Sequence, residues 1–312
     1  MSRSQRLVAV LVSLFALAAF ATPFACADPR PLEPLNAAQI RLGLERMRVV
    51  GSALYIGAHP DDENTAVLAW LQNGKLVHTE YLSLTRGDGG QNLLGTEFGD
   101  RLGVIRTQEL LSARRIDGAE QRFTRAVDFG FSKNADETLR KWGHDRILED
   151  VVWSIRRMQP DILITRFPPD STAGHGHHQA SAILAAEAFR AAADSTRFPE
   201  QLQWVKPWQA KRLVWNVFRF GSQGPDATPG RVSVDVGAYN PVLGKSYGEI
   251  AALSRSMHKS QGFGVAERRG EFVNTFVVQA GAPATKDLFE GVDLTWNRVP
   301  GGERVAPMAA TP

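Results

Sequence analysis

Short continuous apolar runs and longer periodic stretches alternate along the chain. Residues 53–58 form one apolar run, which is too short for a helix with its flanking turn residues and therefore predicts a buried strand. Similar runs predict further strands at 81–85, 162–165, 212–218, 231–236 and 272–279. Apolar residues at helical spacing predict helices at 37–48, 62–73, 101–115, 145–158, 177–192 and 247–258.

The order of these elements predicts an α/β fold. Strands and helices alternate up to about residue 211, which is typical of a parallel sheet covered on both faces. Most later elements are strands, and no long flexible linker separates them from the rest. We therefore expect a Rossmann-like, mainly parallel sheet with helices on both faces and added C-terminal strands. This single domain should cover residues 28–300, followed by a short, flexible tail at 301–312.

Residues 1–27 differ from the rest of the chain. Two arginines precede an uncharged apolar stretch that ends in the letters ACA. A basic start, an apolar core and an A-x-A end are typical of a cleaved signal peptide, which predicts a periplasmic or secreted protein. One alternative is an uncleaved anchor, because residues 7–27 are long enough to span a bilayer. Another is lipidation of Cys26, although Pro23 before it disfavours this modification.

Composition excludes several classes of function. The 312 residues are 43% apolar, which is ample for a large core, and the net charge is +3. Two of these positive charges belong to the leader and no long basic run follows it, so we expect no nucleic-acid partner. Cleavage would remove Cys26, the only cysteine, and with it any disulfide or thiolate ligand. No second segment is apolar enough to cross a bilayer, so we expect no stable membrane span after cleavage.

Imidazole and carboxylate side chains follow two of the predicted strands. The motif AHPDDE comes after the first strand, and GHGHHQA comes after the strand at 162–165. Ligands bind outside the carboxyl ends of the strands in α/β sheets, so we expect the two motifs to meet. Two histidines and a carboxylate form a set that suits Zn2+ and leaves one coordination position for water. The ligands that we expect are His59, Asp62 and His178.

The other polar residues of these motifs fit the same chemistry. Asp61 cannot easily reach an ion that its neighbour Asp62 holds, so we expect it to be the general base for the attacking water. His175 would lie across the substrate carbonyl and stabilise the oxyanion or protonate the leaving amine. As alternatives, the acids could cap a helix and the histidines could form a solvated loop, but their joint position at strand ends favours a metal site. His177 is either without a role or supports a ligand, and Glu63 either starts the helix or supplies a supporting hydrogen bond.

AHPDDE followed by H-x-x-H resembles the PIG-L/LmbE-like deacetylases, zinc hydrolases that remove acyl groups from amines of the N-acetylglucosamine type. The resemblance covers about residues 50–262. The roles that it implies agree with those above: zinc binding by His59, Asp62 and His178, base catalysis by Asp61 and oxyanion stabilisation by His175. Many relatives have proline and aspartate inside the second motif, where this chain has Gly176 and His177. We expect this departure to affect how the neighbouring ligand is oriented.

The resemblance also implies three contacts with the substrate. RTQE is similar to the family's R-x-x-E, in which the arginine, here Arg106, contacts substrate, although an ion pair with Glu109 is an alternative. The loop GDGGQNLLG lacks the spacing of a phosphate loop, but it borders the substrate in similar proteins, so Asp88 should accept a substrate hydroxyl. His258 lies in HKSQGFG, which recurs in relatives, and we expect it at the pocket, although a helix-capping turn also explains these glycines.

Together these features predict an exported zinc-dependent hydrolase. It should remove an acyl group, which we expect to be acetyl, from an N-acyl amino sugar, glycoconjugate or related amide. Two alternatives are a glycan-binding module that keeps the metal without turnover and a zinc esterase or amidase with a non-sugar substrate. Asp61 and His175 argue against the first alternative, because binding alone requires neither.

Overall fold

The computed structural model describes residues 35–218 and 230–305. The chain divides into two compact units, residues 1–40 and 41–312. The described part of the first unit holds the start of α2 (Ala37–Arg46), where Asn36 and Gln39 exchange side-chain to backbone hydrogen bonds of 2.9 Å. The expected signal peptide at 1–27 lies outside the described residues.

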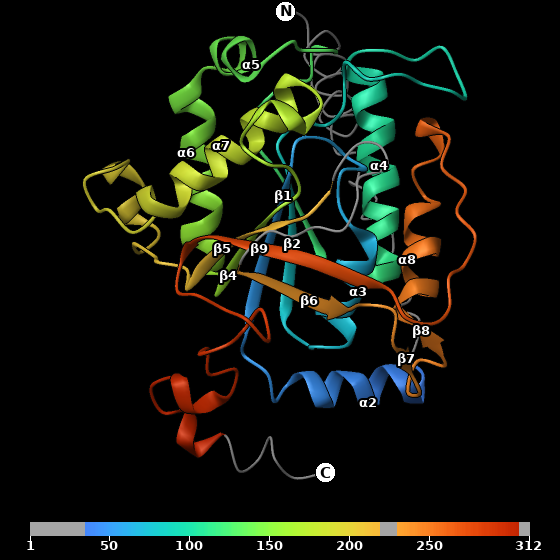
Figure 1. Cartoon of the computed structure of the whole chain (residues 1–312), viewed down its shortest axis with the longest axis vertical. Helices are drawn as coiled ribbons and strands as arrows, with labels where there is room; N and C mark the ends of the chain where they lie inside the picture. Colours follow the sequence, from blue (N-terminus) through green and yellow to red (C-terminus); the bar gives the residue numbers. More distant parts are fainter. Residues whose placement is uncertain (1–34, 219–229, 306–312) are drawn as a thin grey trace, which may run out of the picture. The chain divides into compact units, whose positions relative to one another are not determined.

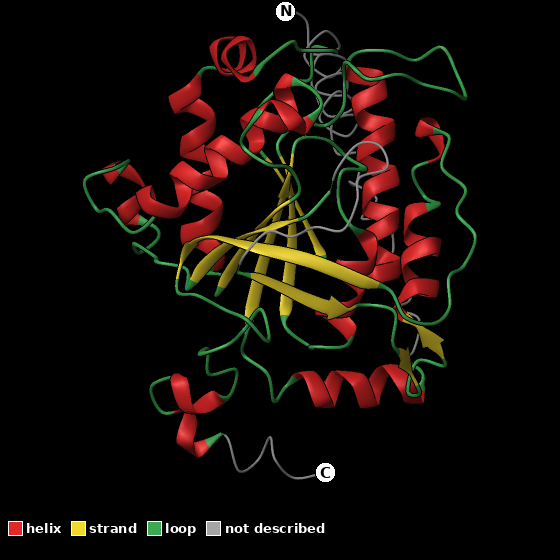
Figure 2. Ribbon diagram, viewed as in Figure 1, coloured by secondary structure: helices red, strands yellow, loops and turns green. Residues whose placement is uncertain are grey.

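The second unit is built on a seven-stranded sheet in the order β3-β2-β1-β4-β5-β9-β6 (Figures 1 and 2). The parallel strands are β1 (Ser52–Gly57), β2 (His78–Ser83), β3 (Glu120–Phe123), β4 (Ile162–Thr165) and β5 (Arg212–Asn216). The antiparallel additions are β9 (Val273–Gly281) and β6 (Arg231–Asp235), and a separate hairpin joins β7 (Tyr239–Asn240) to β8 (Lys245–Ser246). This topology confirms the predicted mainly parallel α/β sheet with added C-terminal strands.

Successive side chains of β1 bury against helices on opposite faces of the sheet (Figure 1). Leu54 and Ile56 belong to a core cluster with α5 (Ala135–Trp142), α6 (His144–Met158) and α7 (Gly176–Ala191). Ala53 and Tyr55 belong to a second cluster with α3 (Thr65–Asn73), α4 (Asp100–Asp117) and α8 (Tyr247–Arg255). Full burial of a large apolar side chain contributes roughly 1.5–3 kcal/mol. A strand that is buried on both faces reads as a continuous apolar run, as in 53–58.

The strand order creates a crevice beside β1. From β1 the chain continues through β2 to β3 at one edge and then returns to β4 on the other side of β1. The loops that leave β1 and β4 therefore diverge at the same end of the sheet, which is where ligands bind in sheets of this type. The two histidine-containing motifs follow these two strands.

Some elements differ from the sequence-based expectation. α3 begins at Thr65 and is capped by the side chain of Asn64, so the acids at 61–63 precede the helix and do not cap it. β3 and α5 were not expected. β3 is polar and only partly buried at the sheet edge, and α5 has only 8 residues. In the expected tail, Gly302–Arg304 form a 3-10 helix, and residues 306–312 lie outside the described part.

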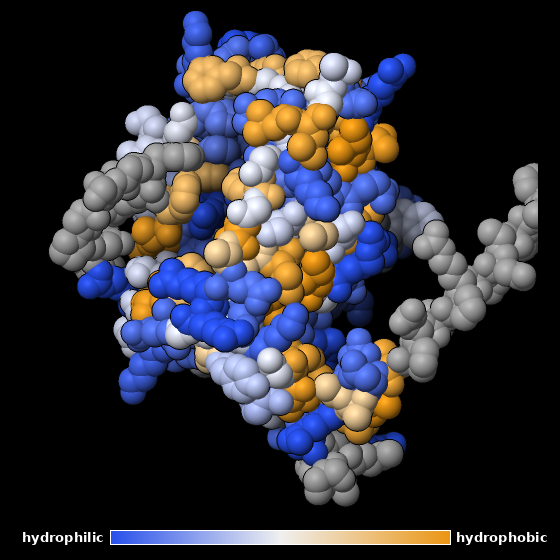
Figure 3. All heavy atoms as spheres, turned by 90° about the vertical axis from the view of Figure 1, so that its right-hand side faces the viewer, coloured by the Kyte–Doolittle hydropathy of each residue, from blue (hydrophilic) through white to orange (hydrophobic). Residues whose placement is uncertain are grey.

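The outward face beside α4 and α8 mixes hydrophilic residues with smaller apolar patches (Figure 3). No helix within residues 35–218 and 230–305 has both the length and the apolar character needed to cross a bilayer. The alternative of an anchor at 7–27 concerns residues outside this part of the chain.

A buried arginine holds the segment that follows α7. Arg156 of α6 is 1% exposed, and its guanidinium donates to the side chain of Gln201 and to backbone carbonyls. These carbonyls belong to Ala191, Ala192, Asp194, Arg197 and Phe198. One side chain thus satisfies the carbonyl groups at the end of α7 and in the turn that leads to β5.

We expect Arg156→Met to destabilise the protein strongly, because it leaves several buried carbonyls without donors. Each unsatisfied buried acceptor costs about 1–3 kcal/mol, so the free energy of unfolding in a denaturant titration should fall by about 3 kcal/mol or more. The control is Arg157→Met at the exposed neighbouring position, which should change stability by less than about 0.5 kcal/mol. Equally small effects in both variants would show that water replaces the guanidinium.

Candidate functional site

The first motif makes a tight turn at the end of β1. Oδ2 of Asp62 accepts hydrogen bonds from the backbone N–H groups of Ala58 at 2.9 Å and His59 at 2.7 Å. The hydroxyl of Tyr81 donates to the His59 carbonyl at 2.6 Å. A Cβ at Gly57 would lie 2.6 Å from that hydroxyl oxygen, so only glycine fits there. The turn therefore fixes the direction of both His59 and Asp62.

The second motif opens α7. His175 is the N-cap residue, and Gly176 packs so closely on the preceding loop that an added Cβ would lie 2.2 Å from the Asn134 carbonyl oxygen. His178 donates from Nδ1 to the Ala173 carbonyl at 2.9 Å, because a carbonyl can only accept. Its ring also stacks on Phe167 with the centroids 3.7 Å apart. Since Nδ1 carries the proton of the neutral ring, Nε2 carries the lone pair that a metal ion requires.

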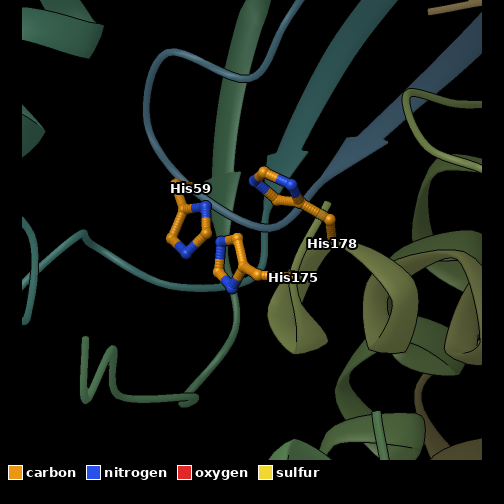
Figure 4. A group of neighbouring side chains, drawn as sticks. All are labelled: His59, His175 and His178. Carbon is orange, nitrogen blue, oxygen red and sulfur yellow. The ribbon is translucent and has the colours of Figure 1, made fainter. Parts of the chain in front are cut away.

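The imidazole rings of His59, His175 and His178 meet between the two motifs (Figure 4), and the carboxylate of Asp62 lies beside two of them. One ring nitrogen from each of His59, His175 and His178 lies within 4.8 Å of the others. The carboxylate of Asp62 spans two of them: Oδ2 is 3.2 Å from His59 Nδ1, and Oδ1 is 3.4 Å from His178 Nε2. Burial alone would raise the pKa of Asp62, but His178 and His59 hold it well below its usual value. The charged oxygen and the imidazole nitrogens form a donor set that suits a divalent metal ion.

The second ring nitrogen of His59, Nε2, faces two buried side chains, His177 and Asp128. Nε2 lies 3.0 Å from Nδ1 of His177 and 3.8 Å from Oδ2 of Asp128. His177 has no exposed surface and packs against Trp142 and Phe129, with ring centroids 4.8 and 4.4 Å away. Burial and the neighbouring imidazoles lower the pKa of His177 to about 2, so its ring is neutral. His59, Asp128 and His177 also lie close enough together to hold a metal ion, but a nitrogen–nitrogen distance of 3.0 Å is that of a hydrogen bond, so we interpret this pair as support for His59.

Asp61 has a left-handed backbone conformation, with φ of 96°, which costs an ordinary residue on the order of 1–3 kcal/mol. Three polar groups of Asp61 are held by neighbours. Its N–H donates to Glu63 at 3.0 Å, its carbonyl accepts from Arg255, and its Oδ1 accepts from Arg106 at 2.6 Å. Burial raises the pKa of Asp61, the charge of Arg106 opposes this effect, and the charge of Asp62 adds to it. The contacts fix a carboxylate that is 20% exposed.

The glycine-rich loop at 87–90 wraps around Arg106. A Cβ on Gly87 or Gly90 would lie 2.3 or 2.5 Å from Nη1 of this arginine, and Gly87 also has a φ of 72°. The alternative ion pair between Arg106 and Glu109 does not form, because Glu109 accepts from the N–H and hydroxyl of Ser260 at 2.7 and 2.6 Å. The glycines of this loop therefore allow the backbone to pack closely around Arg106, which binds Asp61.

Two of the three expected substrate contacts lie away from the cavity. The carboxylate of Asp88 lies against α4, where a Cβ added to Gly103 would be 2.1 Å from it. His258 is completely buried, and its Nε2 lies 2.7 Å from Glu63. Glu63 also accepts from Arg114 at 3.2 Å, so it acts as a supporting hydrogen-bond partner. His258 therefore contacts Glu63, which in turn binds the backbone of Asp61. His258 and Glu63 are 195 positions apart, so no local pattern in the sequence could predict their contact.

The motifs border a cavity of about 750 Å³, a size that suits a small-molecule ligand. Its lining includes three arginines, Arg106, Arg166 and Arg255, and four phenylalanines, Phe131, Phe167, Phe218 and Phe263. The sequence analysis missed Arg166, Arg255 and Asp128. Arg166 directly follows β4, so its place at a strand end was a usable signal, whereas the other two residues have none.

Residues 54–189 match the sequence profile of the PIG-L family, described as GlcNAc-PI de-N-acetylase. The matched segment contains both motifs, and it confirms the resemblance found in the sequence. None of the curated protein sequences matches the chain.

Three solved structures resemble the chain at low sequence identity, and the first of them has the same fold. N,N'-diacetylchitobiose deacetylase from Pyrococcus horikoshii is 18% identical, with 67% of this chain and 70% of that chain covered and a TM-score of 0.51. The conserved protein TT1542 from Thermus thermophilus is 19% identical, with 75% and 96% covered and a TM-score of 0.49. GalB, a 4-carboxy-2-hydroxymuconate hydratase from Pseudomonas putida, is 19% identical, with 77% and 100% covered and a TM-score of 0.49. These similarities concern the fold alone.

We expect His177→Phe to weaken the binding of Zn2+, because phenylalanine keeps the packing but removes the nitrogen that faces His59. Loss of such a supporting contact typically weakens metal binding about 10–100-fold, which competition with a chromophoric chelator measures. His177→Asn, whose side-chain oxygen can replace Nδ1 as acceptor, should stay within about threefold of the wild type. The control is His144→Phe, at a partly exposed histidine at the start of α6. A folded His177→Phe protein with unchanged affinity would rule out the supporting role.

Proposed function

We propose that this protein is a zinc-dependent N-deacetylase that removes an acetyl or related acyl group from an N-acyl amino sugar or glycoconjugate. The observation that carries the proposal is the convergence of His59, Asp62 and His178 beside the constrained carboxylate of Asp61. The family match supports the reaction class, because the matched family is described as a de-N-acetylase. The Pyrococcus horikoshii protein with a similar fold is named for a deacetylation of an acetylated sugar, the substrate class proposed here.

The residues present fit Zn2+. His59, Asp62 and His178 supply two imidazole nitrogens and one carboxylate, and this is a common donor set for catalytic zinc. Both histidines have their other nitrogen engaged, one with His177 and one with the Ala173 carbonyl, which orients their rings. Zn2+ bound there would polarise a substrate carbonyl and lower the pKa of a water molecule.

Asp61 is the proposed general base. Arg106 holds Oδ1, while Oδ2 has no hydrogen bond to any residue in the described ranges. As the water oxygen bonds to the carbonyl carbon, its proton passes to Asp61. The same proton then passes to the amine nitrogen as the C–N bond breaks, which yields the carboxylic acid and the free amine. The raised pKa of Asp61 suits a group that must both accept and return a proton.

His175 is the proposed hydrogen-bond donor to the carbonyl oxygen. Burial and the neighbouring His178 and His59 lower the pKa of His175 to about 3, so the ring is neutral near pH 7. Its Nδ1 lies 3.4 Å from the backbone N–H of His177, which leaves the proton on Nε2. A neutral N–H aimed at an oxygen where negative charge develops stabilises the transition state.

Export is a second part of the proposal. It rests on the basic start, apolar core and A-x-A end of residues 1–27. Intact-mass measurement of protein secreted or recovered from the periplasm tests it, since cleavage should leave Asp28 as the first residue. Full-length protein in the membrane fraction would favour the uncleaved anchor.

The zinc-loaded protein should release acetate and a free amine from saccharides that contain N-acetylglucosamine. Asp61→Asn should keep its zinc but lose about 10²- to 10⁴-fold in kcat, the usual contribution of general acid–base catalysis. The control is Asp145→Asn, at an exposed carboxylate on α6. Tight sugar binding without hydrolysis across a panel of amides and esters would contradict the proposal in favour of a binding module, and faster cleavage of esters would favour an esterase.

A further inference from the structure

Arg166 is built into the cavity wall next to the metal-binding residues. Its backbone N–H donates to the Ile56 carbonyl at 3.1 Å, which extends the pairing of β4 with β1 by one residue. Its guanidinium lines the cavity and lies 4.1 Å from the ring centroid of Phe218. The next residue, Phe167, stacks on His178 at 3.7 Å, so one sugar-sized ligand can reach both Arg166 and the metal-binding residues.

The side chain of Asn216 accepts a hydrogen bond from this guanidinium. Nη1 of Arg166 donates to Oδ1 of Asn216 at 3.3 Å. The same oxygen accepts from the hydroxyl of Tyr55 and from Nδ2 of Asn64, both at 3.0 Å, and Asn216 has no exposed surface. Asn216 therefore holds Nη1 of Arg166, and the ring of Phe218 covers one face of the guanidinium. The hydroxyl of Tyr55 is a further polar neighbour.

Within the described part of the chain, no carboxylate pairs with Arg166. Arg106 pairs with the carboxylate of Asp61, and Arg255 donates to the Asp61 carbonyl. Arg166 forms no ion pair with a carboxylate in the described ranges. Among the described residues, the cavity lining holds three arginines and three aspartates, so a divalent cation would give this part of the lining an excess of two positive charges. A cavity with this balance favours a negatively charged ligand.

We propose that Arg166 binds a carboxylate or phosphate group of the substrate, so that the amino-sugar substrate is anionic. A planar guanidinium presents parallel N–H groups that match either anion, and stacking on Phe218 keeps this plane in place. This inference rests on the N-deacetylase function proposed for the same site and adds the charge of the substrate to it.

The test compares kcat/KM for neutral and anionic sugars. N-acetylglucosamine is the neutral substrate, N-acetylmuramic acid carries a carboxylate, and the 1- and 6-phosphates of N-acetylglucosamine carry phosphate. The wild type should prefer at least one anionic sugar, and Arg166→Gln should lower that preference about tenfold or more. Arg166→Lys keeps the charge without the planar group and should retain part of the preference. Arg140→Gln, at an exposed arginine on α5, is the matched control.

Binding separates this proposal from the catalytic one. Zinc-loaded Asp61→Asn protein, with and without Arg166→Gln, is titrated with the same sugars by calorimetry. If no sugar is hydrolysed but anionic sugars bind in a manner that depends on Arg166, the anion site stands and the deacetylase proposal falls. If neutral and anionic sugars are hydrolysed equally well and Arg166→Gln lowers both equally, the anion site is wrong and the deacetylase stands. The better anionic substrate identifies carboxylate or phosphate as the group bound.

Discussion

The carboxylate of Asp62 joins two loops that are far apart in the sequence. One oxygen accepts two backbone N–H groups of its own turn, and both oxygens face histidines, one from each motif. A buried carboxylate is costly unless hydrogen bonds and positive charge surround it, and all of these contacts meet that requirement. A charged oxygen between two imidazole nitrogens is also a donor set that suits a divalent cation. The rest of the site is arranged around this one group.

A layer of buried hydrogen bonds keeps the reacting groups in position. Asp61 holds an unfavourable backbone conformation because Glu63, Arg106 and Arg255 bind its polar groups. Glu63 is in turn fixed by His258. Burial alone would raise the pKa of Glu63, but its contacts with His258 and Arg114 lower it to about 2. Backbone strain of this kind persists only where the surroundings over-determine it, and it gathers at functional sites. The carboxylate that we propose as the base is therefore fixed in position without a substrate, which favours proton transfer.

His177 marks the point where this chain departs from many members of the family that it resembles. The position inside the second motif that often carries an acid holds an imidazole here, which turns inward to His59. Asp128, from a different loop, places a carboxylate behind both rings. The glycine before it, Gly176, is needed because the start of α7 packs directly on a neighbouring backbone carbonyl. In this chain His177 and Asp128 therefore provide the buried polar contacts behind His59.

The sequence by itself determined the sheet, the main helices and the residues of both motifs. Buried strands and amphipathic helices leave local patterns, and parallel strands bring their carboxyl ends together, so His59, Asp62 and His178 could be assigned to one place. Only the tertiary structure decided which side chains face the cavity. In the folded chain, Asp88 and His258 do not line the cavity, whereas Arg166, Arg255 and Asp128 do. The physical reason is that a local pattern records burial and periodicity, whereas the direction of a loop side chain depends on packing against residues far along the chain.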